Sequence, residues 1–132
     1  VPDNVTVIDE FCPAPKVARL MASADALLHA GDQETFGLVI LEAMACGIPV
    51  VAVAAGAFEE IVDESCGLLC APNNPQAMAN AVRELYSRGC ATLGQQARQH
   101  VERHYAWDTV VDSLLSHYHA VLGDTLPRVA NA

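Results

Sequence analysis

The most apolar stretch of the chain runs from Phe36 to Phe58 and contains one charged residue, Glu42. Its first part is apolar over enough positions for a buried helix, which we predict over residues 35–46. Gly47 suits the left-handed position that ends many helices. Residues 48–53 then have the short apolar run of a buried strand in a parallel sheet. A lone carboxylate in this setting requires an explanation, because burying an unpaired charge costs several kcal/mol.

The pattern of the remaining chain predicts strands that alternate with helices. We expect strands at residues 5–8, 25–29, 48–53 and 68–70, and helical segments at residues 15–23, 35–46, 59–62, 75–88, 93–105 and 110–122. Such alternation indicates an α/β protein. The predicted fold is a Rossmann-like parallel sheet of about four strands with flanking helices and a C-terminal helical segment.

Length and composition narrow the class of protein. A chain of 132 residues with 52% apolar and 17% charged residues is typical of one globular domain. We expect residues 1–123 to belong to that domain and residues 124–132 to form a frayed tail. The net charge of −9 argues against nucleic acid as a partner and against basic patches for a membrane surface. Five irregularly spaced cysteines favour a reducing, cytoplasmic compartment.

Two carboxylates, Glu34 and Glu42, stand eight positions apart around the start of the predicted central helix. In open parallel sheets, ligands bind beyond the carboxyl ends of the strands, beside helix N-termini. Glu34 lies in that loop, and Glu42 lies about 10 Å further along the helix. Free backbone amides of Phe36, Gly37 and Leu38 between them would favour a phosphate. This arrangement suits a ligand with sugars on both sides of a phosphate.

These residues carry a resemblance to a known family. The runs ETFGL, EAMACG and PVV at residues 34–38, 42–47 and 49–51 resemble the E-x7-E segment of retaining GT-B glycosyltransferases. The similarity is closest to the large family four, or group 1, which uses nucleotide-sugar donors. Residues 56–62 resemble the G-x-P-E-I/V turn of the family, and residues 67–69 its G-L-L strand. The resemblance extends over residues 5–122 and implies the donor-binding, C-terminal half of a GT-B fold.

The resemblance implies a role for each residue of this segment. It assigns Glu34, the candidate catalytic residue, to the hydroxyls of the donor sugar, and Glu42 to the ribose of the nucleotide. The full implied donor-binding set is Glu34, Thr35, Phe36, Gly37, Leu38 and Glu42.

Beyond this set, His29 and Glu60 are expected at the rim of the pocket. The resemblance implies transfer with retention of configuration and no cofactor or obligatory metal. The donor that the resemblance implies is a UDP- or GDP-sugar. The sequence GDQET at residues 31–35 is similar to that of mannosyltransferase-like members.

The resemblance also implies parts that this stretch lacks. A GT-B enzyme has a separate N-terminal acceptor domain, and its donor domain carries an Arg and a Lys for the diphosphate. We therefore expect this chain to be part of a larger glycosyltransferase, to bind the donor, and to transfer little or no sugar alone. The parent would be cytoplasmic, or held at the inner face of a membrane through the missing domain. A further hypothesis is a homodimer formed through the unpaired first strand at residues 5–8.

Other interpretations of the sequence remain open. Glu42 would also suit the solvent-facing side of an amphipathic helix. The fold would also suit a non-catalytic module that binds nucleotide sugars, or a GT-B-like epimerase. His100 and His104 are four positions apart, a spacing that zinc sites use, but we interpret them as a solvated helix face. The cysteines are interpreted as small buried or half-buried residues rather than metal ligands.

Overall fold

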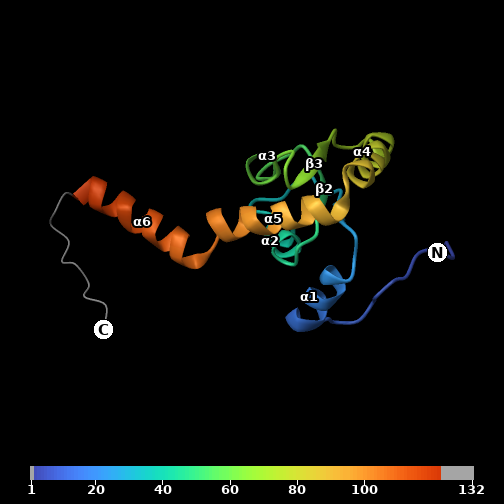
Figure 1. Ribbon diagram of the computed structural model, residues 1–132, viewed down its shortest axis with the longest axis horizontal. Helices are drawn as coiled ribbons and strands as arrows, with labels where there is room; N and C mark the ends of the chain where they lie inside the picture. Colours follow the sequence, from blue (N-terminus) through green and yellow to red (C-terminus); the bar gives the residue numbers. More distant parts are fainter. Residues whose placement is uncertain (1, 123–132) are drawn as a thin grey trace.

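The computed structural model describes residues 2–122 and shows three strands and six helices among them (Figure 1). In chain order these elements are α1 (Ala14–Ala22), β1 (Leu27–His29), α2 (Leu38–Ala45), β2 (Val50–Val53), α3 (Phe58–Ile61), β3 (Gly67–Cys70), α4 (Pro75–Arg88), α5 (Cys90–His104) and α6 (Trp107–Leu122). The predicted tail at residues 124–132 lies outside the described part of the chain. None of the described helices combines the length and apolarity needed to cross a membrane.

The strands form one parallel sheet in the order β1-β2-β3, which confirms the predicted α/β class. At its centre, Val51 of β2 pairs in register with Leu28 of β1 and Leu68 of β3. All four residues of β2 are buried. The continuous apolar run at residues 50–53 therefore reflects a strand that is covered on both faces.

Helices pack around this sheet to form one core. α2 contacts β1 and β2, α4 contacts β2 and β3, and α5 packs against both α2 and α4. The largest fully buried side chains come from several of these elements: Phe58, Ile40, Met44, Leu85, Val50 and Val51. The core thus lies where the central helix α2 and the central strand β2 meet the helices that follow them.

The close packing of α5 depends on a residue without a side chain. A Cβ atom placed on Gly94 of α5 would lie 2.1 Å from the carbonyl oxygen of Gly47, in the turn between α2 and β2. No side chain fits at that separation, so glycine allows helix and turn to touch backbone to backbone. This contact holds α5 against the end of α2.

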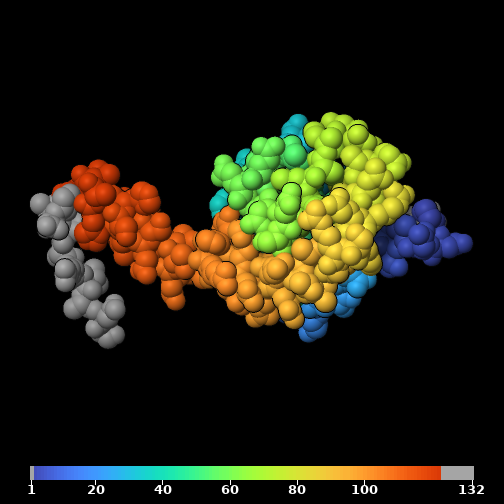
Figure 2. Space-filling view, turned by 45° about the horizontal axis from the view of Figure 1, so that its top comes forward, coloured from blue at the N-terminus to red at the C-terminus, as the bar shows by residue number. Residues whose placement is uncertain are grey.

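The last helix leaves the compact body of the molecule. Figures 1 and 2 show α6 projecting away from the sheet, with α5 as the nearest element. Although α6 has an apolar stripe at helical spacing, none of its residues is buried. Its exposed apolar side chains are Trp107, Val110, Val111, Leu114, Leu115, Tyr118, Val121 and Leu122.

The predicted first strand is wrong. Residues 5–8 form no strand in the structure, and the sheet has three strands rather than about four. Val5, Val7 and Ile8 are 50%, 62% and 49% exposed. Alternating apolar residues make a strand only when a neighbouring strand supplies the other half of the hydrogen bonds, and no described strand lies beside them. The homodimer expected through residues 5–8 is not tested by the structure of a single chain and stays a prediction.

Candidate functional site

Glu34 lies in the loop between β1 and α2, as the sequence predicted. Its Oε1 atom is 3.7 Å from Nε2 of His29, the last residue of β1. Both side chains are partly enclosed, with 40% of Glu34 and 21% of His29 exposed. The carboxylate and the imidazole therefore form a pair at the carboxyl end of the edge strand.

His29 is held in place from its other side. Its ring packs edge-on against Phe58 of α3, with 5.0 Å between the ring centroids. Its Nδ1 atom is buried and has no hydrogen-bond partner among the described residues. The apolar contact thus orients the imidazole so that Nε2 points to Glu34.

The loop that carries Glu34 touches the loop that follows β2. A Cβ atom on Gly56, whose φ is +55°, would lie 2.6 Å from the carbonyl oxygen of Glu34. Glycine supplies both the left-handed backbone and the close approach. The loops after β1 and β2 therefore meet at the carboxyl edge of the sheet, where parallel α/β proteins bind ligands.

The central helix begins later than predicted. Gly37 is the N-cap of α2, with φ +77°, and the helix runs from Leu38 rather than from residue 35 or 36. Gly37 breaks the helix because its left-handed backbone cannot continue into a right-handed turn. Leu38 and Val39 are the first helical residues, and their amides have no acceptor within the helix. The predicted amide cradle thus includes Gly37 and Leu38, while Phe36 lies just before the cap.

Glu42 is exposed, so the expected burial of a lone charge does not occur. It lies about 6 Å along the axis from Leu38. Its neighbours Ile40, Leu41, Ala43 and Met44 point into the core. The apolar run around Glu42 is explained by these buried positions, and Glu42 occupies the outer side of the helix.

An apolar hollow of about 480 Å³ lies beside Glu42. Glu42 is the one charged residue among those that line it: Phe36, Leu38, Leu41, Glu42, Ala45, Val101, Tyr105, Trp107 and Val110. α2 provides one wall, and the end of α5 with the start of α6 provides the other. Val101 and Tyr105 were not predicted to lie here, because they are far from α2 along the chain.

A second hollow, of about 220 Å³, brings Thr35 and Phe36 together with Glu60 of α3. Ala57, Ile61 and Tyr105 complete its lining. Burial raises the pKa of Tyr105, and the nearby Glu60 carboxylate raises it further. Glu60 therefore lies next to the predicted donor-binding segment, and Phe36 and Tyr105 contribute to both hollows.

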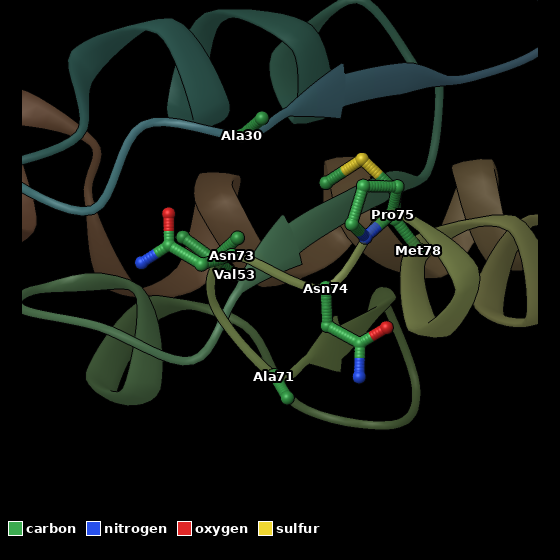
Figure 3. Close-up of a pocket in the computed structure, with 7 residues that line it drawn as sticks. All are labelled: Ala30, Val53, Ala71, Asn73, Asn74, Pro75 and Met78. Carbon is green, nitrogen blue, oxygen red and sulfur yellow. The ribbon is translucent and has the colours of Figure 1, made fainter.

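A third hollow, of about 360 Å³, lies beyond the carboxyl ends of all three strands (Figure 3). Ala30 follows β1, Val53 ends β2, and Ala71 follows β3. Polar groups come from Asn73, whose φ is +53°, and from Asn74, the N-cap of α4. Asn73 and Asn74 were not predicted as site residues, although their position after the last strand places them at the ligand-binding edge.

A family model described as glycosyl transferases group 1 matches residues 1–88. The chain belongs to this family. The match contains Glu34, Glu42 and the residues between them, so the resemblance stated from the motif is confirmed.

Curated relatives of this group 1 chain are glycosyltransferases by name. A GDP-mannose-dependent alpha-(1-6)-phosphatidylinositol dimannoside mannosyltransferase from Mycobacterium tuberculosis is 42% identical over 100 residues, which are 76% of this chain and 26% of that protein. A D-inositol 3-phosphate glycosyltransferase from Mycobacteroides abscessus is 36% identical over 83% of this chain and 25% of its own length. The chain thus spans about a quarter of the length of these relatives.

Solved structures give the same picture. Anabaena HepE in complex with UDP superposes with a TM-score of 0.69 at 30% identity, over 77% of this chain and 29% of that chain. Sucrose-phosphate synthase from Thermosynechococcus elongatus gives a TM-score of 0.70 at 31% identity, over 80% and 27%. The arrangement of strands and helices described above is therefore that of the GT-B glycosyltransferases.

Proposed function

We propose that this chain is the donor-binding portion of a glycosyltransferase that transfers a sugar from a nucleotide sugar to an acceptor. One observation carries the proposal: Glu34 and Glu42 flank the N-terminus of α2 at the carboxyl edge of the sheet, within the segment that matches the group 1 family. The names of the relatives support it, since one is GDP-mannose-dependent and HepE has been solved with UDP-glucose.

We infer that Glu34 binds the hydroxyls of the donor sugar and that Glu42 binds the ribose. A carboxylate accepts two hydrogen bonds from neighbouring hydroxyls without a change of protonation. The N-terminus of α2 lies between them and offers amides of Gly37 and Leu38, which favour a diphosphate. His29 supports this role of Glu34, because its Nε2 atom faces the carboxylate and orients it.

We further propose transfer with retention of configuration and without an obligatory metal. Retention places the acceptor hydroxyl on the face from which the nucleotide leaves, so the donor phosphate itself assists the proton transfer. The proposal gives Glu34 a binding role towards the sugar and assigns it no proton transfer.

We also infer that the chain alone transfers little sugar. The three hollows at this edge of the sheet have linings that include no Lys or Arg. A diphosphate carries charge that amides alone neutralise only partly. The basic residues that neutralise the diphosphate, and the binding site for the acceptor, would lie in the part that corresponds to the remaining three quarters of the relatives' length.

The test is the thermal stability of the chain in the presence of UDP, GDP, ADP and their sugar conjugates. A ligand at 100 times its Kd stabilises the folded state by about 2.7 kcal/mol. We expect one nucleotide to raise the melting temperature. In Glu42→Gln, the affinity for that nucleotide should be at least tenfold lower. Asp112→Asn removes another exposed carboxylate, on α6, and serves as the matched control.

The outcomes separate the alternatives. Binding that is lost in Glu42→Gln and kept in Asp112→Asn supports the ribose role and identifies the base. Equal binding by both variants overturns the assignment of Glu42. A second experiment replaces the matching segment of a full-length relative with this chain. If that hybrid binds the intact nucleotide sugar but transfers no sugar, the non-catalytic module is favoured instead.

A further inference from the structure

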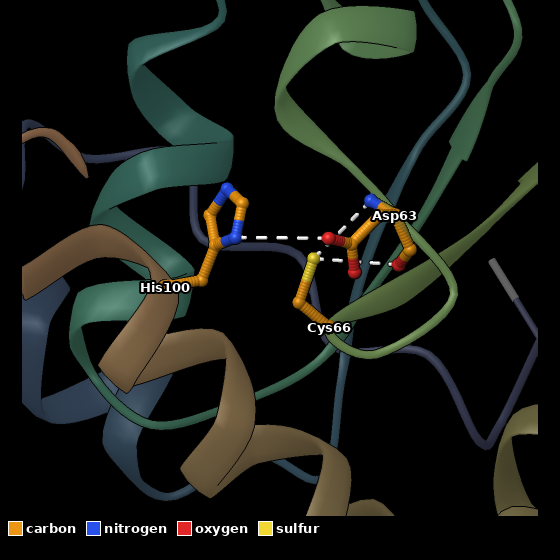
Figure 4. A group of neighbouring side chains, drawn as sticks. All are labelled: Asp63, Cys66 and His100. Atoms are coloured by element: carbon orange, nitrogen blue, oxygen red, sulfur yellow. Dashed lines mark hydrogen bonds and ion pairs between the residues drawn. The ribbon is translucent and has the colours of Figure 1, made fainter. Parts of the chain in front are cut away.

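Three side chains that the donor site does not use meet at the opposite edge of the sheet. Asp63 follows α3, Cys66 directly precedes β3, and His100 lies on α5 (Figure 4). One oxygen, sulfur or nitrogen atom from each lies within 4.8 Å of the other two. Carboxylate, thiolate and imidazole are all ligands of zinc.

Asp63 already presents one oxygen to this cluster. Its Oδ1 atom accepts hydrogen bonds from the backbone N–H and the hydroxyl of Ser65, at 2.8 Å and 2.5 Å. These bonds fix one side of the Asp63 carboxylate. Its Oδ2 atom remains free of them and faces Nδ1 of His100 at 3.7 Å. This is the same separation as that between His29 and Glu34: close enough for an ion pair and too long for a hydrogen bond.

Cys66 is the fixed member of the cluster. It is fully buried, and its sulfur accepts from the backbone N–H of Asp63 at 3.3 Å. Figure 4 shows the sulfur between Asp63 and the side of α5 that carries His100. Burial raises the pKa of the Cys66 thiol to about 11, and its sulfur also donates to the carbonyl oxygen of Asp63 at 3.4 Å, so a metal ion must displace the thiol proton in order to bind.

The spacing fits a tetrahedral ion after small movements. Zinc bonds of about 2.0–2.3 Å place neighbouring ligand atoms roughly 3.3–3.5 Å apart. Closing the observed spread requires a shift of roughly an ångström, which is small for a surface side chain. Asp63 has the most freedom to contribute to it, because its side chain is 58% exposed, while the imidazole of His100 is 19% exposed.

The fourth position of such a site would face solvent. A polar hollow of about 370 Å³ adjoins Asp63 and His100, while Cys66 lies beneath it and does not line it. The other residues that line it are Ser65, Gln96, Gln99, Arg103 and His104. A water molecule in this hollow would complete the coordination. A thiolate and an imidazole together select a borderline-soft ion such as Zn²⁺ over Mg²⁺ or Ca²⁺, which prefer oxygen ligands.

We propose that Asp63, Cys66 and His100 form a zinc-binding site that ties the turn before β3 to helix α5. On binding, the ion replaces the thiol proton of Cys66, which passes to water. The site lies at the amino end of β3, whereas Glu34 lies beyond the carboxyl end of β1. Its occupancy therefore stabilises the fold and leaves nucleotide binding unchanged.

The experiment titrates Co²⁺, and then Zn²⁺ in competition, into metal-free protein without an affinity tag. We expect one equivalent to bind, with the near-ultraviolet absorption that a thiolate ligand gives to cobalt, and a higher melting temperature with Zn²⁺. His100→Gln and Asp63→Asn should each weaken binding by roughly tenfold or more. Both substitutions change partly exposed side chains, so we expect both variants to fold. Cys66→Ala is less suitable, because it leaves a cavity at a buried position.

The matched controls are His117→Gln on α6 and Cys12→Ser near the N-terminus, which change an exposed histidine and a cysteine outside the cluster. Both should bind Co²⁺ as the unchanged protein does. A cobalt complex without thiolate absorption, or affinity that is the same in His100→Gln, overturns the proposal. Loss of binding in either control would likewise place the metal elsewhere.

Discussion

Gly37 is the residue on which the geometry of the donor edge depends. Its backbone has φ +77°, and a Cβ atom there would lie 2.8 Å from the ring of Phe58, which is fully buried. We predict that Gly37→Ala lowers the free energy of unfolding by roughly 2–4 kcal/mol, from left-handed backbone strain together with overpacking. Urea denaturation measures this loss.

Gly47 provides the matched control for that substitution. Its φ is +80°, but nothing lies within 4 Å of an added Cβ atom. Gly47→Ala should therefore cost only the backbone strain, about 1–2 kcal/mol. An equal loss in the two variants would show that the contact with Phe58 has no energetic effect.

At the level of single residues, the sequence predicted where Glu34 lies in the fold, while its donor-binding role stays a prediction. The motif identified Glu34 and Glu42, and Gly47 was correctly predicted to follow the helix in a left-handed conformation. The exposure of Glu42 was not predictable, because an apolar run does not reveal which side of a helix remains outside. The pairing of His29 with Glu34 depends on the loop path, which Gly56 shapes from beyond the next strand.

Among the helices, α5 is the one whose position depends on a backbone contact. Gly94→Ala would place a methyl group against the carbonyl oxygen of Gly47, which has little freedom to move. We predict a loss of about 1–3 kcal/mol in the free energy of unfolding, because α5 must shift away from the end of α2.

Gln95→Ala is the control for this prediction, since Gln95 is the exposed neighbour on the same helix. It should change stability by less than about 0.5 kcal/mol. Chemical denaturation of the two variants side by side gives the comparison. If Gly94→Ala is as stable as Gln95→Ala, helix and turn do not touch as described.

The ends of helices were predictable where a capping residue or a proline sets them. Asn74 and Pro75 begin α4 as expected, and the Asn74 side chain accepts from the amide of Ala77 at 2.9 Å. The strand expected at residues 5–8 failed, because strand formation depends on a partner that local alternation cannot show. α6 was predicted as a helix, but its pattern did not reveal that the apolar stripe remains uncovered.

Across the whole molecule, stability is concentrated around the sheet. Leu85 of α4 is fully buried, whereas Leu114 of α6 is 50% exposed. We predict that Leu85→Ala lowers the free energy of unfolding by about 2–5 kcal/mol, through lost burial and the cavity it leaves. Leu114→Ala should change it by less than about 0.5 kcal/mol.

Thermal and urea unfolding of these two variants tests this division of the molecule. The same chemical change is made in both, so the difference reports only the surroundings of the two leucines. Comparable losses would mean that α6 packs onto the body of the molecule in solution.

The projection of α6 has a consequence for how the chain diffuses. A compact chain of this length has a radius of gyration of about 14 Å. α6 has 16 residues and so reaches about 24 Å along its axis, from one side of the body. The molecule is therefore an elongated particle, which sediments more slowly and rotates less uniformly than a sphere of equal mass. The backbone amides of α6 should therefore differ in NMR relaxation from amides that point in other directions, because the helix lies along the long axis of the molecule (Figure 1).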